Sequence, residues 1–337
     1  SQGINIDRQN NTINDNSVRE DITLFEWDFE GDLWNNDGGW ELTETSYNSE
    51  THSYLSPNTV ATQNAVWNLT SDIVTLPALG DGEIMRFKFW LWGDTPDTDG
   101  NNDSYLDDYY QLSIMDLEAL SWHASEDAPG SSDGSAYWCA DEAIGPDGGY
   151  LDEWMQYLDT PALTLGDNAT VSAKLRWRIE DPAGAVVAGS CTDGWDAANV
   201  RISTDGGTTW DLLSDPNLPY DFDCGYGWIY NDSEYDTGGS LNQVAAGWGG
   251  QSAGREFVDF SADLSAYAGQ EVIVRFAFGS DPAYNTFDQT DMTGFQVDNI
   301  VIEDATGVVY SDDCDGSINS QEMTPSGEVW ESMFYDY

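Results

Sequence analysis

The sequence has few basic residues. Lysine and arginine together number 10, against 62 aspartate and glutamate residues, and the formal net charge is −52. A nucleic-acid-binding surface uses basic side chains to displace phosphate counterions, so this composition excludes non-specific nucleic-acid binding. Anionic membranes attract proteins through basic segments for the same electrostatic reason. We therefore expect neither nucleic acid nor an anionic membrane surface as a partner.

Histidine is nearly absent, and the histidine motif of zinc peptidases is absent. The two histidines are His52 and His123, and neither lies in a His-Glu-x-x-His motif. The sequence contains no Cys-x-x-Cys pair for zinc. A glycosidase needs only two carboxylates, and the 62 acidic residues offer no way to single out such a pair. We predict that the chain is not an enzyme.

No hydrophobic run in the sequence is long enough to span a membrane. The chain begins Ser-Gln-Gly without a methionine, which is typical of a mature product whose signal peptide has been removed. We therefore expect a secreted or cell-surface protein without membrane insertion.

Cysteine is scarce but even in number. Four cysteines in a secreted chain favour disulfides, and four allow three connectivities. Cys191 and Cys224 flank a long insertion at residues 211–256, which favours the pair Cys191–Cys224 and leaves Cys139–Cys314 as the second pair. The alternative is that the cysteines are free, buried thiols.

Aromatic residues are abundant. They form 13% of the chain, including 15 tryptophans, so the acidity does not indicate disorder. Two interpretations of the acidity remain open: a solvated surface adapted to salt, or carboxylates that bound Ca²⁺ partly neutralises. Self-repulsion at this net charge opposes a compact state unless cations screen it. Because aspartate falls mostly in loops, where calcium sites are built, we predict structural Ca²⁺.

The hydrophobic pattern from Ile22 onward is that of β-strands. Residues 84–90 and 272–276 are short apolar or alternating runs separated by Gly, Asp, Asn and Pro turns, and helical periodicity is nearly absent. Residues 203–210 superficially suggest a phosphate-binding loop, but no lysine follows their glycines. We interpret them as a β-hairpin in which Gly206 and Gly207 supply positive φ. The predicted fold class is all-β.

An internal repeat divides the chain. Residues 69–76 and 158–165 match, and each is followed by a strand, an acidic loop and a second similar strand. The first copy stops near Asp116, and half a sandwich would expose an apolar sheet face. It must therefore merge with the second copy, take strands from the tail, or receive them from another chain. The predicted organisation is an arm at 1–21, a partial copy at 22–118, a complete copy at 119–305 and a tail at 306–337.

Several acidic loops have the spacing of calcium sites. A first loop places carboxylates at alternate positions around a glycine, and a second follows EF-hand spacing from the third position to the twelfth but has Ser311 at the first. Each has a solvated acidic turn as its alternative. A further, weaker pair lies in Asp-Gly-Trp-Asp. The candidate ligands are Asp97, Asp99, Asp103 and Asp107 in the first loop, Asp313, Asp315, Asn319 and Glu322 in the second, and Asp193 and Asp196 in the pair.

Three fragments carry a family resemblance: Asp-Gly-Trp-Asp through Asp-Gly-Gly-Thr-Thr-Trp at 193–210, Asp-Leu-Ser-Ala-Tyr-Ala-Gly-Gln and the strand after it at 263–276, and Gly-Phe-Gln-Val-Asp-Asn-Ile-Val-Ile at 294–302. Together they resemble the jelly-roll domains that follow the catalytic part of immune-inhibitor-A-type metallopeptidases. They are also similar to MAM domains and cleaved-adhesin modules. The resemblance covers residues 119–305 well and 22–118 loosely.

The resemblance implies a jelly-roll sandwich and a structural Ca²⁺. In such modules the ion lies between an acidic residue at the first strand and an aspartate on the last. The matching positions here are Asp28 and Glu30 at the start and Asp298 near the end. Glu30 belongs to the partial copy, whereas Asp298 belongs to the complete one.

The aromatic residues of the insertion allow a second interpretation. Trp228, Tyr230 and Trp248 lie in residues 211–256, and aromatic rings stack on sugars. They form either a carbohydrate-binding rim or a cover over a sandwich edge. Our leading hypothesis is a non-enzymatic extracellular surface protein, stabilised by calcium and disulfides. It would act in adhesion or as a subunit of a filament or layer built by strand exchange. The expected partners are further copies of the chain, surface glycans or surface proteins. The alternatives are a carbohydrate-binding module and an accessory domain of a secreted hydrolase.

Overall fold

The computed structural model divides the chain into two compact units, residues 1–96 and residues 97–337. Strands dominate both units, and the helical elements of the described residues are three 3₁₀ turns of three residues each, so the predicted all-β class is confirmed. None of these helical turns is long and apolar enough to cross a membrane. The structure describes residues 4–10, 22–31, 33–36, 39–48, 50–56, 67–80, 83–93, 110–115, 122–129, 134–186, 191–229, 244–315 and 322–336.

The first unit is built around a three-stranded antiparallel sheet. Its central strand is β1 (Ile4–Asn10), which pairs with β2 (Ile22–Trp27) on one side and β7 (Glu83–Lys88) on the other. Part of the expected arm at residues 1–21 is therefore a strand of this sheet. The unit also contains two short antiparallel pairs, β3 (Asn35–Asn36) with β6 (Leu69–Thr70) and β4 (Glu41–Thr43) with β5 (Ser53–Leu55).

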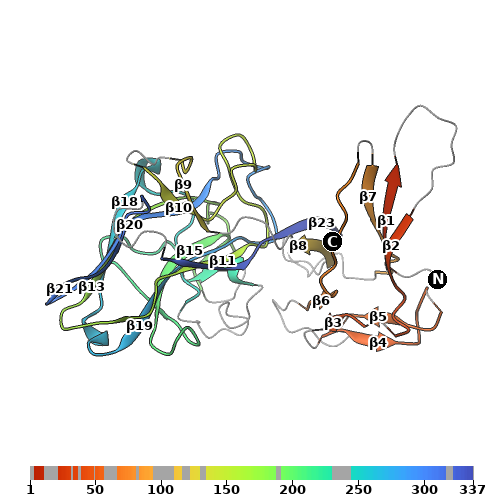
Figure 1. Ribbon diagram of the computed structural model, residues 1–337, viewed down its shortest axis with the longest axis horizontal. Helices are drawn as coiled ribbons and strands as arrows, with labels where there is room; N and C mark the ends of the chain where they lie inside the picture. Colours follow the sequence, from red (N-terminus) through yellow and green to blue (C-terminus); the bar gives the residue numbers. More distant parts are fainter. Residues whose placement is uncertain are drawn as a thin grey trace. The chain divides into compact units, whose positions relative to one another are not determined.

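The second unit contains two six-stranded antiparallel sheets. We name each after its longest central strand. The β20 sheet has the order β18 (Val258–Asp263), β13 (Thr170–Arg178), β20 (Gly294–Asp304), β10 (Ala136–Trp138) and β9 (His123–Ser125), with β21 (Gly307–Asp312) also paired to β20. The β19 sheet has the order β16 (Asp211–Leu212), β15 (Ala197–Ser203), β19 (Glu271–Gly279), β11 (Met155–Asp159) and β22 (Thr324–Glu328), with β12 (Leu163–Thr164) also paired to β19. Figure 1 shows both sheets and labels their strands apart from β12, β16 and β22.

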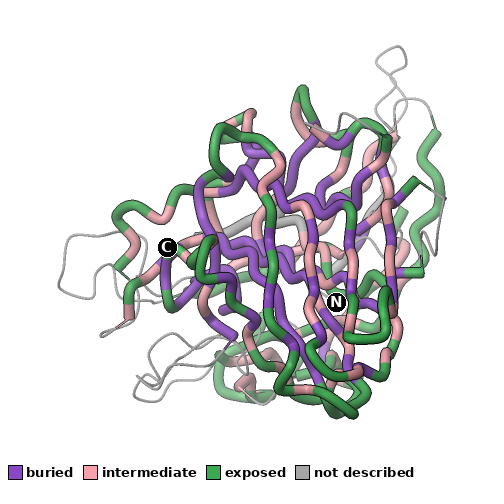
Figure 2. Tube along the Cα trace, turned by 90° about the vertical axis from the view of Figure 1, so that its left-hand side faces the viewer, coloured by how far each residue is buried: buried purple, intermediate pink, exposed green. Residues whose placement is uncertain are grey.

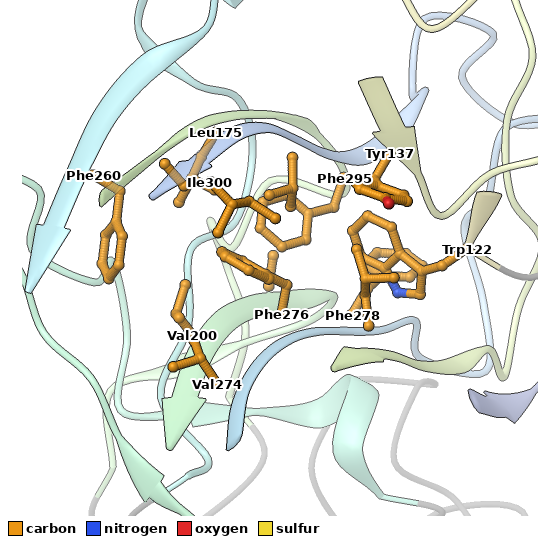
Figure 3. Packing of buried hydrophobic residues seen from close by; sticks show 14 of the residues in the cluster. Trp122, Tyr137, Leu175, Val200, Phe260, Val274, Phe276, Phe278, Phe295 and Ile300 are labelled. Carbon is orange, nitrogen blue, oxygen red and sulfur yellow. The ribbon is translucent and has the colours of Figure 1, made fainter. Parts of the chain in front are cut away.

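The two sheets share one apolar core, so the second unit is sandwich-like. Alternation along the strands turns Leu175 and Ile300 of the β20 sheet and Val274 and Phe276 of the β19 sheet towards each other (Figure 3). Burying a side chain of this size contributes about 1.5–3 kcal/mol. Figure 2 shows long buried stretches that run side by side through the molecule. The jelly-roll connectivity implied by the resemblance remains a prediction.

The β19 sheet carries charged and aromatic residues on its other face. The Arg275 guanidinium pairs with both carboxylate oxygens of Asp159, at 2.7 and 2.8 Å, and lies 4.1 Å from the ring centre of Tyr157 and 3.8 Å from that of Trp210. Such a bidentate, stacked arrangement suits arginine and not lysine. Trp210 is the last residue of the stretch 203–210 that we interpreted as a hairpin. Pairing of β15 with β16 and the positive φ of Gly206 and Gly207 confirm that hairpin.

The tail belongs to the second unit. Within residues 306–337, β21 pairs with β20, β22 pairs with β11, and β23 (Trp330–Asp336) pairs with β8 (Tyr110–Met115). Strand β8 is the last strand of the expected first copy, so the tail supplies its pairing partner. The expected boundary between residues 118 and 119 falls inside the second unit.

Candidate metal centre

Three connections meet at one end of the second unit: the one that follows β13, the one that precedes β15 and the one that follows β19. The last residue of β19, Gly279, lies opposite both Met155 and Ala197, which begin β11 and β15. In the β20 sheet, Arg178 at the end of β13 lies opposite Gly294 at the start of β20. The loop from β19 to β20 joins the two sheets at this end. The residues just beyond these strand ends are therefore brought together.

An acidic trio occupies this end. Glu180 follows β13, Asp196 precedes β15 and Asp281 follows β19. One oxygen from each carboxylate lies within 4.8 Å of the others. Asp196 and Asp281 are only 1% and 5% exposed, whereas Glu180 is partly exposed. These three carboxylates can hold a metal ion.

Hydrogen bonds fix the trio. Asp196 accepts the backbone N–H of Asp281 at 2.9 Å and that of Glu180 at 3.2 Å, and it also accepts the Tyr150 hydroxyl. One oxygen of Asp281 accepts the backbone N–H of Ala283 at 3.0 Å. Oxygen Oε2 of Glu180 is buried and has no hydrogen-bond partner among the described residues. The site is thus held by backbone donors, and one carboxylate oxygen remains available to a ligand.

The trio is electrostatically costly without a cation. Burial first, and then repulsion from the neighbouring carboxylates, raises the pKa of Glu180 and of Asp281. Burial also raises the pKa of Asp196, although its hydrogen bonds oppose the rise. Two like charges at this separation repel by about 3–4 kcal/mol at an effective dielectric of about 20. A bound cation or a proton is therefore needed to balance the site.

Two further carboxyl groups lie beside the trio. Burial raises the pKa of Asp152 to about 6 and that of Glu153 to about 7. Asp152 accepts the side-chain amide of Asn285 at 2.9 Å, and the backbone N–H of Glu153 donates to the carbonyl of Asp281 at 3.0 Å. All the ligand atoms of the trio are oxygens, which are the ligands that hard cations such as Ca²⁺ and Mg²⁺ prefer.

Only one predicted ligand, Asp196, belongs to this trio. Its predicted companion, Asp193, instead lies beside the disulfide formed by Cys191 and Cys224. Those sulfurs are bonded to each other and offer no thiolate to a metal. Glu180 and Asp281 were not among the ligands predicted from the sequence. The sequence signal that could have found them is an acidic residue shortly after each of two core strands and before a proline, at Glu180-Asp-Pro and Asp281-Pro.

The EF-hand-like loop is described only in part. Asp315 accepts the backbone N–H of Ser135 at 2.6 Å, and Asp313 accepts that of Asp315 at 3.2 Å. No metal-ligand group found among the described residues includes Asp313, Asp315 or Glu322. Five other predicted ligands lie outside the described residues: Asp97, Asp99, Asp103, Asp107 and Asn319.

The site implied by the resemblance combines residues of both units. Asp28 and Glu30 belong to the first unit and Asp298 to the second. Hydrogen bonds, first of all from the Thr51 side chain, lower the pKa of Glu30 to about 2. Its carboxylate also accepts the backbone N–H of His52 at 2.9 Å. Calcium at Asp28, Glu30 and Asp298 remains a prediction.

One of the two predicted disulfides is confirmed, and the other is wrong. Cys191 and Cys224 form the predicted disulfide, with a Cα–Cα distance of 5.9 Å. The second pair is wrong, because Cys139 and Cys314 are free and buried. The sulfur of Cys139 accepts the backbone N–H of Phe295, whereas β21, which leads to Cys314, pairs with β20 from Ile300 onward. Burial raises the pKa of both thiols, that of Cys314 to about 12.

The predicted sugar-binding rim also requires correction. Trp228 and Trp248 are buried, so neither offers a ring face to a sugar. Trp248 stacks on Trp177, with ring centres 5.1 Å apart, and joins the sandwich core. Trp228 lies under the guanidinium of Arg201, 4.6 Å from its ring centre. Both tryptophans cover the sandwich, which is the alternative that the sequence left open, and Tyr230 lies outside the described residues.

Comparison with known proteins adds no family. No family model matches the chain, and no curated protein matches it.

Proposed function

We propose that this chain is a non-enzymatic extracellular surface module whose second unit is stabilised by calcium at Glu180, Asp196 and Asp281. The observation that carries the proposal is the convergence of three carboxylates, two of them buried, within 4.8 Å. Without a cation, like charges in this position oppose folding. With one, the same charges hold three loops together.

Calcium fits this site better than other common cations. Thiolate and imidazole ligands, which favour zinc and copper, are absent from the trio. Ca²⁺ accepts irregular oxygen geometries and backbone carbonyls, whereas Mg²⁺ demands a near-ideal octahedron. Calcium sites of extracellular modules typically have dissociation constants of about 10⁻⁴ to 10⁻³ M. We therefore expect saturation at millimolar calcium.

A surface role in adhesion or assembly draws on two other features. The Cys191–Cys224 disulfide is consistent with an extracellular location, because such bonds persist in oxidising compartments. The first unit carries large apolar side chains that its own strands leave exposed, including Ile73, Trp90 and Trp92. Exposed apolar groups of this size favour contact with a partner. The jelly-roll connectivity of the resembled modules is part of the same proposal.

Thermal unfolding tests the calcium site. Calcium at 100 times its dissociation constant should stabilise the wild-type protein by about 2.7 kcal/mol, and a chelator should remove that gain. In Asp281→Asn we expect a higher melting temperature without calcium, because one repulsive charge is gone. We also expect little further gain when calcium is added.

The matched control is Glu303→Gln, which removes one negative charge at an exposed position of β20. It should keep the full calcium gain. An equal response of the wild type and Asp281→Asn to calcium would refute the site.

Sedimentation tests the surface role. We expect the wild-type protein to form oligomers in millimolar calcium, and the double variant Trp90→Ser, Trp92→Ser to form fewer. If the wild-type protein and the double variant both stay monomeric with and without calcium, assembly is contradicted. Adhesion to a different partner is then the remaining form of the proposal.

A further inference from the structure

Exposed apolar side chains lie on the loops that extend from the acidic trio. Tyr284 and Phe287, which are 46% and 69% exposed, follow Asp281 in the loop between β19 and β20. Val186 is exposed on the loop that begins at Glu180. The same end of the second unit thus presents the acidic trio and two exposed aromatic rings.

The loop that carries the two rings is held by its own hydrogen bonds. Asn285 accepts the backbone N–H of Phe287 at 2.8 Å, and its amide donates to Asp152 at 2.9 Å. The hydroxyl of Thr286 is buried and donates to the carbonyl of Met292 at 2.7 Å. Phe287 is therefore displayed by an ordered loop. Rings displayed in this way are typical of binding loops on a rigid scaffold.

The backbone at Tyr284 supports the same conclusion. Its φ is 71°, in the left-handed region that residues other than glycine rarely adopt. Such a conformation persists only where the surrounding structure imposes it, and it is concentrated at functional sites. Here it lies in the exposed loop that starts at Asp281.

The charges around the rings select the kind of partner. Asp181 and Asp288 lie on the same two loops, and the whole chain has a net charge of −52. This field repels anionic ligands and anionic lipid headgroups. A neutral saccharide is not repelled, its ring stacks on aromatic faces, and its hydroxyl groups donate to carboxylates.

We propose that Tyr284 and Phe287 form a calcium-dependent binding site for a neutral saccharide. The inference rests on the proposed calcium site, because Asp281 anchors the start of the loop and a cation bound there holds that anchor in place. The site differs from the one expected at Trp228 and Trp248. It places the aromatic faces at the end of the sandwich and not in the insertion.

Binding to neutral polysaccharides tests the proposal. The probes are soluble dextran, mannan and xylan and insoluble cellulose and chitin, each in millimolar calcium and in chelator. We expect at least one probe to bind the full-length protein in calcium and not in chelator. Phe287→Ala should weaken that binding about tenfold or more, since a tenfold loss corresponds to one lost stacking contact.

Two substitutions at the same position separate a sugar from a lipid or protein surface. Phe287→Tyr keeps the ring and should keep binding, whereas Phe287→Leu keeps only an apolar side chain and should behave like Phe287→Ala. Val308→Ala, which removes an exposed apolar side chain from β21, should bind like the wild type. Binding to phosphatidylcholine vesicles that Phe287→Leu retains would overturn the saccharide proposal in favour of a membrane.

Failure of this inference is distinguishable from failure of the calcium site. If calcium raises the melting temperature but no probe binds, or binding survives chelation, the saccharide site is refuted and the calcium site stands. If calcium leaves the melting temperature unchanged, both are refuted. Phe287→Ala should keep the full thermal response to calcium.

Discussion

Glu153 is a buried carboxyl group whose ionisation works against the fold. Its backbone has a positive φ of 66°, and one carboxyl oxygen accepts the Ser113 hydroxyl of β8 at 3.0 Å. The other oxygen is buried and has no partner among the described residues. Burial raises its pKa from 4.5 to about 7. The protonated form is therefore the one that the folded protein favours.

The pH dependence of this group has a definite sign. Between pH 4.5 and about 7 the folded state binds a proton that the unfolded state has lost, so stability falls as the pH rises through this range. The loss attributable to Glu153 is at most about 3 kcal/mol. We expect Glu153→Gln to match the wild type in urea unfolding at pH 4.5 and to be more stable at pH 8.

The control for this prediction is Glu271→Gln, which removes an exposed carboxylate from β19. Its unfolding free energy should follow that of the wild type at both pH values. Parallel pH profiles for Glu153→Gln and the wild type would show that Glu153 ionises normally.

At the scale of elements, the insertion at residues 211–256 is fixed to the sandwich at several points. The Cys191–Cys224 disulfide ties its first half to the segment before β15. The side-chain amide of Asn199 on β15 donates to the carbonyls of Val244 and Ala246, at 2.9 and 2.8 Å. The disulfide spans 33 residues, and closing a loop of that length lowers the entropy of the unfolded chain by an amount worth about 3–4 kcal/mol.

We expect the double variant Cys191→Ser, Cys224→Ser to lose about 3–4 kcal/mol in urea unfolding. A reductant should destabilise the wild type by a similar amount and leave the variant unchanged. Because Asp196 lies five residues after Cys191, we also expect the variant to bind calcium more weakly. A variant with wild-type stability would show that the other contacts alone fix the insertion.

The strands were the most predictable elements. Alternation at residues 84–90 and 272–276 corresponds to β7 and β19, because side chains on a half-buried strand must alternate. Residues 4–10 also form a strand, β1, although we expected an arm at residues 1–21. Amino-acid composition did not predict this strand. The reason is that pairing with a strand on each side satisfies the backbone hydrogen bonds of β1 whatever its side chains are.

The acidic trio was only partly predictable. Asp196 was a candidate because it lies in a short acidic motif, but its partners Glu180 and Asp281 are 16 and 85 residues away. Local spacing identifies metal sites built from one loop, and it fails for sites assembled from strand ends. The sugar-binding rim predicted from the aromatic residues of the insertion was wrong for a related reason. A tryptophan such as Trp248 has the same composition signal whether it covers a core or lines a rim.

The charge of the whole molecule limits its stability. A net charge of −52 leaves most carboxylates without a basic partner, and ion pairs such as Lys174 with Asp259 neutralise few of them. Like charges spread over a compact surface destabilise the folded state more than the expanded chain. Salt shortens the Debye length from about 10 Å at 0.1 M to about 3 Å at 1 M, which screens this repulsion.

We therefore expect sodium chloride to raise the melting temperature by about 5–10 °C between low and molar concentrations, which corresponds to a gain of about 2–3 kcal/mol. The effect should shrink near pH 3, where most carboxylates are protonated and little repulsion remains to be screened. Calcium at matched ionic strength should add a further rise at neutral pH, and Asp281→Asn should lose that further rise while keeping the response to sodium chloride. This difference separates a specific cation site from general screening. A calcium effect no larger than that of sodium at equal ionic strength would mean that the acidic trio is balanced by protons and that the acidity of the chain is a property of its surface alone.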